Sequence, residues 1–359
     1  MALTTARAGL TPQQWDSKFF MEYVRENRFK RYMGTDENSI IHTKEDLTTK
    51  PGNKVTFAAV NKLTGTGVTG NTTLEGNEEE LDTRSMAVTV NPLRHAVAVT
   101  NWDEQKSTIE LRDTAKMALK LWSMEKMKND VVAALGSING VAYADASSAQ
   151  RNAWVVDNSD RVLFGALKSN YSATLATALG NIDNTADKLT PEAVSLMKRI
   201  AMTASPAIKP IRLNEDEEWF VLFANSRAFR DFSLNSTVTQ ANRDARARGM
   251  DNPLFTGGSL VWDGVIVREI PEIGILSGVG AGSIDVGPVY LCGAQAIGVA
   301  YAQRTKTTTQ VADYGFRNGV GVQEIRGIEK LIFGSGAGDT DDLKDHGIVT
   351  GFFAGVADA

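Results

Sequence analysis

Imidazole and thiol groups are scarce in this sequence. The three histidines are His42, His95 and His346, and the one cysteine is Cys292. A Ser-His-Asp or Cys-His site would need one of these histidines as its general base. His95, however, follows Arg94 in a strand-like run, and the other two are expected in polar loops. We therefore expect no catalytic residues and no enzyme activity, with a hydrolase that uses His95 as the weaker alternative.

Metal ligands are equally poorly supported. The sequence has no Cys-x-x-Cys pair and no His-Glu-x-x-His motif, so we expect no zinc site. Cys292 lies in an apolar run that predicts a buried thiol in a strand. An acidic group near the C-terminus could bind a divalent cation, but its glycine and glutamate positions do not match a calcium loop, and we interpret it as a surface loop. Its members are Asp339, Asp341, Asp342, Asp345 and His346.

A nucleotide cofactor is not expected either. The run Gly65-Thr-Gly67-Val-Thr-Gly70 matches the dinucleotide fingerprint by its letters alone. That motif must open a helix whose amides face the pyrophosphate, and residues 71–76 that follow are poor helix formers. We interpret the glycines as a flexible loop tip, and we expect no cofactor.

Composition indicates an ordinary globular protein. Of the 359 residues, 42% are hydrophobic and 23% are charged. The longest apolar runs, such as 286–291, are far shorter than the about 20 residues of a membrane span, so no membrane partner is expected. The net charge of −5 argues against a dedicated nucleic-acid binder. Basic residues gather in 1–34 and acidic ones in 75–82 and 215–218, which suits contacts between copies of the chain or, alternatively, solvated faces.

The N-terminal basic residues fall on one side of a predicted helix. Apolar residues near helical spacing indicate a short amphipathic helix within 12–33, with Arg25, Arg28 and Arg31 on another face. This face could contact nucleic acid or a partner, or the helix could pack on its own domain.

A long polar segment interrupts a pair of strands. Alternating apolar residues predict strands at 55–59, 86–90 and 97–99. Residues 61–84 between the first two are rich in Gly, Thr, Asn and Glu and offer little to bury. Because loops longer than about 12–15 residues are usually functional or interacting, we predict a two-stranded flap that extends beyond its own core. An isolated ribbon is marginally stable, so a neighbouring copy is the natural support.

The strongest helical signal follows the flap. Ser107 and Glu110 fit a capping box, and no Gly or Pro occurs from there to Gly136. The predicted helix of about 29 residues would be about 43 Å long and would act as a spine.

The remaining chain predicts a mixed α+β body. We expect helical and irregular structure over 139–210, with Thr190 capping a helix that begins at Pro191. Asp263-Gly264 predicts a tight hairpin turn. Further expected elements are a strand at 218–224, a helix near 226–232, the hairpin over 260–267, strands at 288–293, 297–303 and 320–333, and a loop at 334–342.

The order of five short motifs resembles a subfamily of tailed-bacteriophage major capsid proteins. The resemblance extends over about residues 10–335. The motifs are Leu74-Glu-Gly-Asn-Glu-Glu-Glu-Leu81, Val90-Asn-Pro-Leu-Arg-His-Ala-Val97 with Trp102, Phe223-Ala-Asn-Ser-Arg-Ala-Phe229, Asn252-Pro-Leu-Phe255 and Trp262-Asp-Gly.

The resemblance implies the Johnson fold shared with the herpesvirus capsid floor. It divides the chain into an N-terminal arm (1–50), an extended β loop (51–101), a peripheral domain (102–209) with a spine helix at about 104–136, an axial domain (210–335), and a C-terminal loop and strand (336–359). It further implies hexamers and pentamers that form an icosahedral head around double-stranded DNA, located in the virion and assembled in the host cytoplasm. An encapsulin-type nanocompartment and a surface adhesion or decoration protein are the alternatives.

The same resemblance suggests partners and contact residues. Only about 50 residues precede the flap, whereas some relatives carry a long N-terminal scaffolding segment that is cut away. This implies either a separate scaffolding protein or a chain already trimmed, and Met1 favours the separate protein. We also expect a portal, with a decoration protein left open. Glu78, Glu79, Glu80 and Lys62 are candidate contacts between subunits. Arg25, Arg28 and Arg31 are candidates for non-specific contact with genomic DNA. The lysine-asparagine cross-link of some members is not assigned to any residue.

Overall fold

The computed structural model divides into two compact units that interleave along the chain. It describes residues 27–48, 51–60, 62–63, 65–81, 83–107, 109–212, 217–246, 260–335 and 341–358. The first unit comprises Met1–Arg28, Pro92–Lys128 and Gln303–Ile325, and the second comprises Phe29–Asn91, Asn129–Ala302 and Arg326–Ala359. No helix among these described residues is long and apolar enough to cross a membrane.

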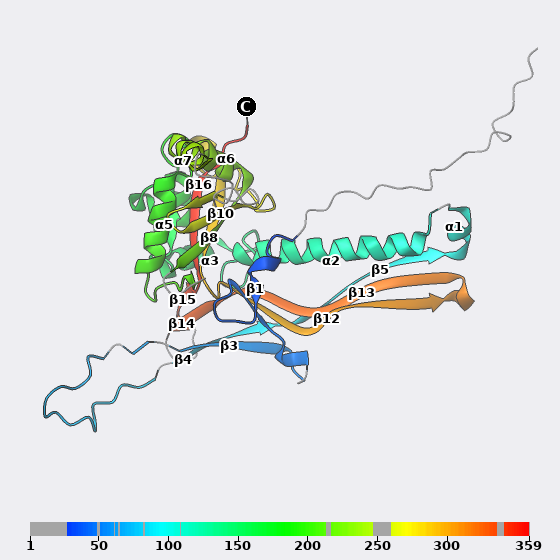
Figure 1. Ribbon diagram of the computed structural model, residues 1–359, viewed down its shortest axis with the longest axis horizontal. Coiled ribbons are helices and arrows are strands. Elements are labelled where there is room, and N and C mark those ends of the chain that lie inside the picture. Colours follow the sequence, from blue (N-terminus) through cyan, green and yellow to red (C-terminus); the bar gives the residue numbers. More distant parts are fainter. Residues whose placement is uncertain are drawn as a thin grey trace, which may run out of the picture. The chain divides into compact units, whose positions relative to one another are not determined.

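A seven-stranded sheet forms the centre of the second unit (Figure 1). Its order is β6 (Val162–Phe164), β16 (Ile348–Ala354), β11 (Val286–Cys292), β8 (Glu218–Ala224), β10 (Val265–Glu269) and β9 (Leu260–Trp262), with β7 (Ile211–Arg212) also paired to β8. Strands β11 and β16 are antiparallel and every residue of both is buried. Such continuous burial requires cover on both faces of the sheet.

Helices supply that cover through two separate hydrophobic clusters. On one face, Val349 and Phe353 of β16 pack with α5 (Pro191–Thr203) and α6 (Ser226–Leu234). On the other face, Phe352 and Ala354 pack with α3 (Ser148–Asp157) and α4 (Leu175–Gly180). The alternation follows from the two-residue repeat of a strand. Helix α7 (Ser236–Arg246), which was not expected from the sequence, follows α6.

Two local signals are confirmed. The Thr190 side chain accepts a hydrogen bond from the Ala193 amide at 3.3 Å and caps α5, whose first residue is Pro191. Asp263 and Gly264 join β9 to β10 with φ angles of 48° and 73°. Both residues of a type I′ turn need positive φ, so this turn matches the hairpin expected from the sequence.

The flap is confirmed as a two-stranded element with a long connection. We use "flap" for β3 (Lys54–Val60), β4 (Thr83–Thr89) and the residues between them. The strands are antiparallel, with Lys54 opposite Thr89 and Val60 opposite Thr83. Val55, Phe57 and Val88 are at most 3% exposed, so the base of the flap is anchored by buried side chains.

In the first unit, helix α2 (Leu111–Leu135) packs on strands. Leu119 of α2 forms a buried cluster with Val320 and Val322 of β13 (Arg317–Lys330), and Val97 of β5 (Asn91–Thr100) packs against it. A five-stranded sheet has the order β1 (Met33–Gly34), β2 (Ile41–Lys44), β12 (Ile297–Ala312), β13 and β5. Helix α2, β12 and β13 each continue from one unit into the other.

The spine helix is shorter than predicted. The chain forms α1 (Asn101–Lys106), leaves the helical conformation at Ser107, and resumes helix as α2 (Leu111–Leu135). Ser107 adopts an extended backbone with φ −91° and ψ 135°, and its Oγ accepts from the Ile109 amide rather than that of Glu110. The expected capping box is therefore wrong, because Ser107 ends one helix instead of starting the next.

Three other expectations need correction. The predicted loop at 334–342 is in part a hairpin, because β14 (Ile332–Ser335) pairs with β15 (Asp341–Asp345). The strand predicted at 320–333 is divided at Leu331 between β13 and β14. The helix predicted within 12–33 falls mostly outside the described residues, and its end consists of a single 3-10 turn at Lys30–Tyr32 followed by β1.

Candidate functional site

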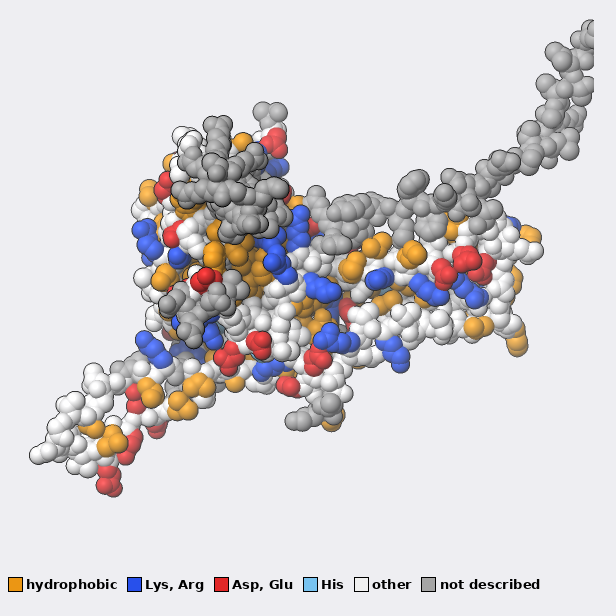
Figure 2. Space-filling view, in the orientation of Figure 1, with side chains coloured by type: hydrophobic (Ala, Val, Ile, Leu, Met, Phe, Trp, Pro, Cys, Tyr) orange, Lys and Arg blue, Asp and Glu red, His pale blue; other side chains and the backbone are white. Residues whose placement is uncertain are grey.

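The predicted contact residues of the flap are all exposed to solvent. Lys62, Glu78, Glu79 and Glu80 are exposed, as is every described residue from 69 to 81. Figure 2 shows acidic side chains along this connection. A segment with so little buried surface gains almost no stability from its own chain.

Two of the glutamates shape the flap itself. The Glu79 carboxylate accepts a hydrogen bond from the Gly65 amide at 2.7 Å and so joins the two sides of the connection. The Glu78 carboxylate accepts from the Gly76 amide, also at 2.7 Å. Gly76 has a φ of 86°, a left-handed conformation that favours glycine. These hydrogen bonds are exposed, so water can replace them at little cost.

The basic N-terminal candidates are only partly described. Arg25 lies outside the described residues. Arg28 and Arg31 are exposed on either side of Phe29, which is fully buried and contacts Phe223 edge-on at 5.1 Å. The Arg31 guanidinium lies 5.9 Å from the centre of the Tyr32 ring. Phe29 thus anchors the start of the described chain to the central sheet and leaves the neighbouring arginines in solvent.

Each histidine packs against an aromatic ring. His42 contacts Phe57 at 5.8 Å, His95 contacts Trp122 at 4.6 Å, and His346 contacts Phe333 at 4.9 Å between ring centres. These contacts give each imidazole a packing role. The polar loop expected at His42 is wrong, because this residue is buried in β2.

Cys292 is fully buried in β11, as the sequence predicted. Burial raises the pKa of its thiol, so the reactive thiolate is disfavoured.

The acidic group near the C-terminus does not form the predicted surface loop. Asp341, Asp342 and Asp345 lie in β15, and Asp345 is buried, while Asp339 lies outside the described residues. Among the described residues no group of three or more His, Cys, Asp or Glu is placed to hold a metal ion. The spacing of these acidic residues did not indicate that Asp345 pairs with Lys330.

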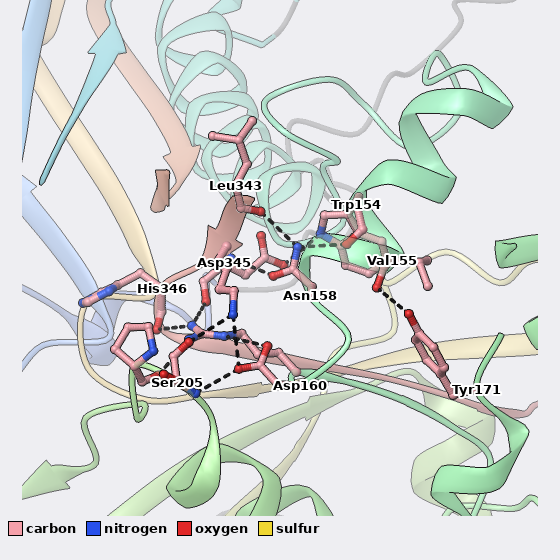
Figure 3. Close-up of polar contacts among 12 residues, drawn as sticks. Trp154, Val155, Asn158, Asp160, Tyr171, Ser205, Leu343, Asp345 and His346 are labelled. Carbon is pink, nitrogen blue, oxygen red and sulfur yellow. Dashed lines mark hydrogen bonds and ion pairs between the residues drawn. The ribbon is translucent and has the colours of Figure 1, made fainter. Parts of the chain in front are cut away.

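Asp345 is the centre of a buried polar network (Figure 3). Its Oδ2 lies 2.8 Å from Lys330 Nζ and accepts a hydrogen bond from Trp154 Nε1 at 3.2 Å. Its backbone amide donates to Asn158 Oδ1 at 2.8 Å, while Asn158 Nδ2 donates to the Leu343 carbonyl at 3.1 Å. The network therefore connects α3 to the hairpin β14–β15 and to the last residue of β13.

Arg161 extends this network toward the loop after α5. Its guanidinium donates to the carbonyls of Asp345 and, at 2.7 Å, Pro206. Asp160 lies 3.5 Å from Arg161 Nε and accepts from the Ser205 amide at 2.9 Å. Arg161 is 1% exposed, so its charge is stabilised by these partners and not by water.

His346 follows the network in sequence and remains neutral in the folded chain. Burial, together with the positive charges of Arg161, Arg84 and Lys209, lowers its pKa to about 4. A positive imidazole at this position would lose hydration and would lie beside like charges.

The Lys330–Asp345 pair yields a first prediction. Lys330→Met should lower the free energy of unfolding by about 3–5 kcal/mol, because it leaves the buried Asp345 carboxylate without its cation. Lys330→Met combined with Asp345→Leu should recover most of this loss. The more exposed pair Lys198–Asp263, at 3.2 Å, provides a matched control, and Lys198→Met should cost less than about 1 kcal/mol in the same urea titration. Equal losses at the two sites would contradict the assignment.

His346 gives a second, pH-dependent prediction. Unfolded His346 takes up a proton near its ordinary pKa of about 6.5, whereas the folded residue stays neutral down to about 4. Its contribution to stability is therefore complete above pH 6.5 and is lost as the pH falls toward 4. Between pH 7 and 4.5 the original chain should lose about 2 kcal/mol more than His346→Gln. Urea unfolding of unassembled chains at both pH values measures the difference, and identical pH dependence would refute it.

Comparison with known proteins identifies the family. A family model described as phage capsid protein matches residues 4–351. The major capsid protein of Pseudomonas phage KPP25 is 27% identical over 97% of this chain and 96% of its own length. The solved capsid asymmetric unit of cyanophage Pam1 is 39% identical with a TM-score of 0.88 and covers 100% of both chains. The solved capsid of Ralstonia phage GP4 is 21% identical with a TM-score of 0.76 and covers 99% of both chains.

These matches confirm the resemblance found in the sequence. They do not favour the nanocompartment alternative, and they confirm the expected α+β capsid fold. The chain belongs to the phage capsid protein family and is a major capsid protein of a tailed phage.

Proposed function

We propose that this chain forms hexamers and pentamers that close into an icosahedral head around double-stranded phage DNA. The observation that carries the proposal is the flap, whose connecting residues from 69 to 81 are exposed while its base is buried. An element of this kind provides contact area for a neighbouring copy. Many weak contacts of this sort sum to a stable lattice while each one stays reversible.

The same proposal assigns a part of the capsid fold to each segment of the chain. Residues 1–50 serve as the arm, 51–101 as the extended loop, 102–209 as the peripheral domain, 210–335 as the axial domain, and 336–359 as the C-terminal segment. The protein acts as a structural component and not as an enzyme. A separate scaffolding protein and a portal take part in assembly in the host cytoplasm, and a decoration protein is a further candidate partner.

Charge reversal in the flap tests shell formation. The unaltered chain, expressed alone and together with its neighbouring genes, should form closed polyhedral particles in negative-stain electron microscopy. Glu78→Lys, Glu79→Lys and Glu80→Lys together should reduce particle yield at least about tenfold. The new lysines would repel the basic groups that the glutamates contact on a neighbouring copy. Far-ultraviolet circular dichroism should show the variant folded. Normal particles from the folded variant would refute the role of the flap, and a monodisperse monomer from the unaltered chain would refute shell formation itself.

The basic arm gives a separate prediction about the genome. Replacing Arg25, Arg28 and Arg31 by Gln should weaken genome retention in filled heads, because non-specific DNA contacts depend on neutralised phosphates. The difference from the original heads should shrink as the salt concentration rises. The measurement is nuclease-accessible DNA after heating across a salt series, with Lys116→Gln as a control on α2. Equal retention at every salt concentration would exclude a DNA contact of the arm.

A further inference from the structure

A cavity of about 310 Å³ lies beside the central sheet of the second unit. Its floor is one face of the antiparallel strands β11 and β16. In their register Tyr290 lies opposite Thr350 and Pro288 lies opposite Phe352, and all four residues line the cavity. Because residues two apart in a strand share a face, these side chains form one continuous surface. The cavity is therefore built on two strands in which every residue is buried.

Apolar residues from three other segments form the walls of the cavity. Leu135 and Ile138, both buried, come from the end of α2 and the turn that follows it, and Trp154 comes from α3. Ile275 and Leu276 contribute from the segment that precedes β11. A concave, mainly apolar site with a few polar groups is typical of small-molecule binding.

Small residues surround the part of the cavity that opens to solvent. Ala133, Ala142, Ala144 and Gly274 line the cavity and are exposed. A β-carbon added at Gly274 would meet no atom within 4 Å, so open space lies at this point. A ligand can therefore enter from solvent past side chains of minimal size.

The floor of the cavity carries a hydroxyl group that lacks a partner. Thr350 is 3% exposed, and its Oγ1 is buried without a hydrogen-bond partner among the described residues. A buried hydroxyl in this state costs free energy, because it has lost water and gained nothing in return. A ligand that forms a hydrogen bond with Thr350 would recover this cost.

The size and the lining of the cavity define the class of ligand. A cavity of about 150 Å³ lined by Leu, Ile and Phe can hold benzene, so a volume about twice as large suits two fused rings. Trp154, Tyr143 and Phe352 provide aromatic surfaces for such rings. A charged ligand would lose its hydration without a free counter-charge, because Lys330 at the edge of the cavity is already paired with Asp345 at 2.8 Å.

From these observations we infer that the cavity binds a neutral aromatic alcohol of about two fused rings. Its hydroxyl forms a hydrogen bond with Thr350, and its rings contact Trp154 and Phe352. The inference goes beyond shell formation and does not depend on it, because every lining residue belongs to the second unit of one chain. A ligand that binds only the folded chain also raises its melting temperature.

Two ligands that differ by one hydroxyl provide the first test. The binding of 2-naphthol and of naphthalene to the unassembled chain is measured by equilibrium dialysis. Thr350→Val keeps the shape of the side chain and removes its hydroxyl. It should weaken 2-naphthol binding at least about fivefold and change naphthalene binding less than about twofold, because only 2-naphthol then buries an unpaired hydroxyl.

A second threonine serves as the control for this test. Thr43 is buried in β2 and does not line the cavity, so Thr43→Val should change the binding of neither ligand. An equal effect of Thr350→Val on both ligands, or no effect on 2-naphthol, would overturn the assigned hydrogen bond.

Closure of the opening provides the second test. Ala142→Trp should abolish the binding of both ligands, because the larger side chain fills the entry. Ala118→Trp, which changes an exposed residue of α2 outside the cavity, should bind both ligands as the original chain does. Far-ultraviolet circular dichroism should show both variants folded. Undiminished binding by the folded Ala142→Trp chain, or no binding of 2-naphthol to the original chain, would overturn the site.

Assembled particles provide the last test. Particles of the original chain should bind 2-naphthol with the same affinity as unassembled chains, because the site lies within one chain. Binding that is present in unassembled chains and lost in particles would overturn the proposal, since a neighbouring copy would then occupy the cavity.

Discussion

The buried ion pair between Lys330 and Asp345 is the constraint on which the second unit depends. Each charge is almost completely removed from water, so either one alone would be strongly destabilising. Lys330 ends β13 and Asp345 ends β15, while Trp154 and Asn158 bring α3 to the same place. The pair is satisfied only when these elements meet in one arrangement. Packings that leave either charge buried without its partner are therefore costly.

The outward elements obey a different rule. The flap connection and the distal part of β12 are exposed over most of their length and contribute little to the folded state of the single chain. In the proposed shell, these segments must stay soluble before assembly and form contacts with other copies after it. Charged and threonine-rich segments meet both demands, because they stay hydrated alone and can still pair by main-chain hydrogen bonds. A buried sheet with exposed extensions suits a protein that must fold first and assemble with other copies afterwards.

Local signals were the most reliable part of the sequence. Thr190 with Pro191, and Asp263 with Gly264, act through neighbours within three residues, so their conformations were readable without the fold. Ser107 shows the limit of such reasoning. Its spacing to Glu110 fits a capping box, yet the chain turns there from α1 to α2, and Ser107 Oγ binds the Ile109 amide instead. A hydroxyl can serve several nearby amides, and tertiary packing decides among them.

Sequence patterns alone predicted the class of protein, the flap, the burial of Cys292 and the order of motifs shared with phage capsid proteins. These depend on composition, periodicity and short spacing. The packed fold was needed to show that Asp345 is a buried partner of Lys330, Trp154 and Arg161, because the latter two lie more than 180 residues away in the chain. It also decided that, within the described part of the chain, the pairing of β12 with β2 ends at Ala300. Contacts between distant residues and the ends of strand pairing are properties of the packed chain, and no local pattern of side chains encodes them.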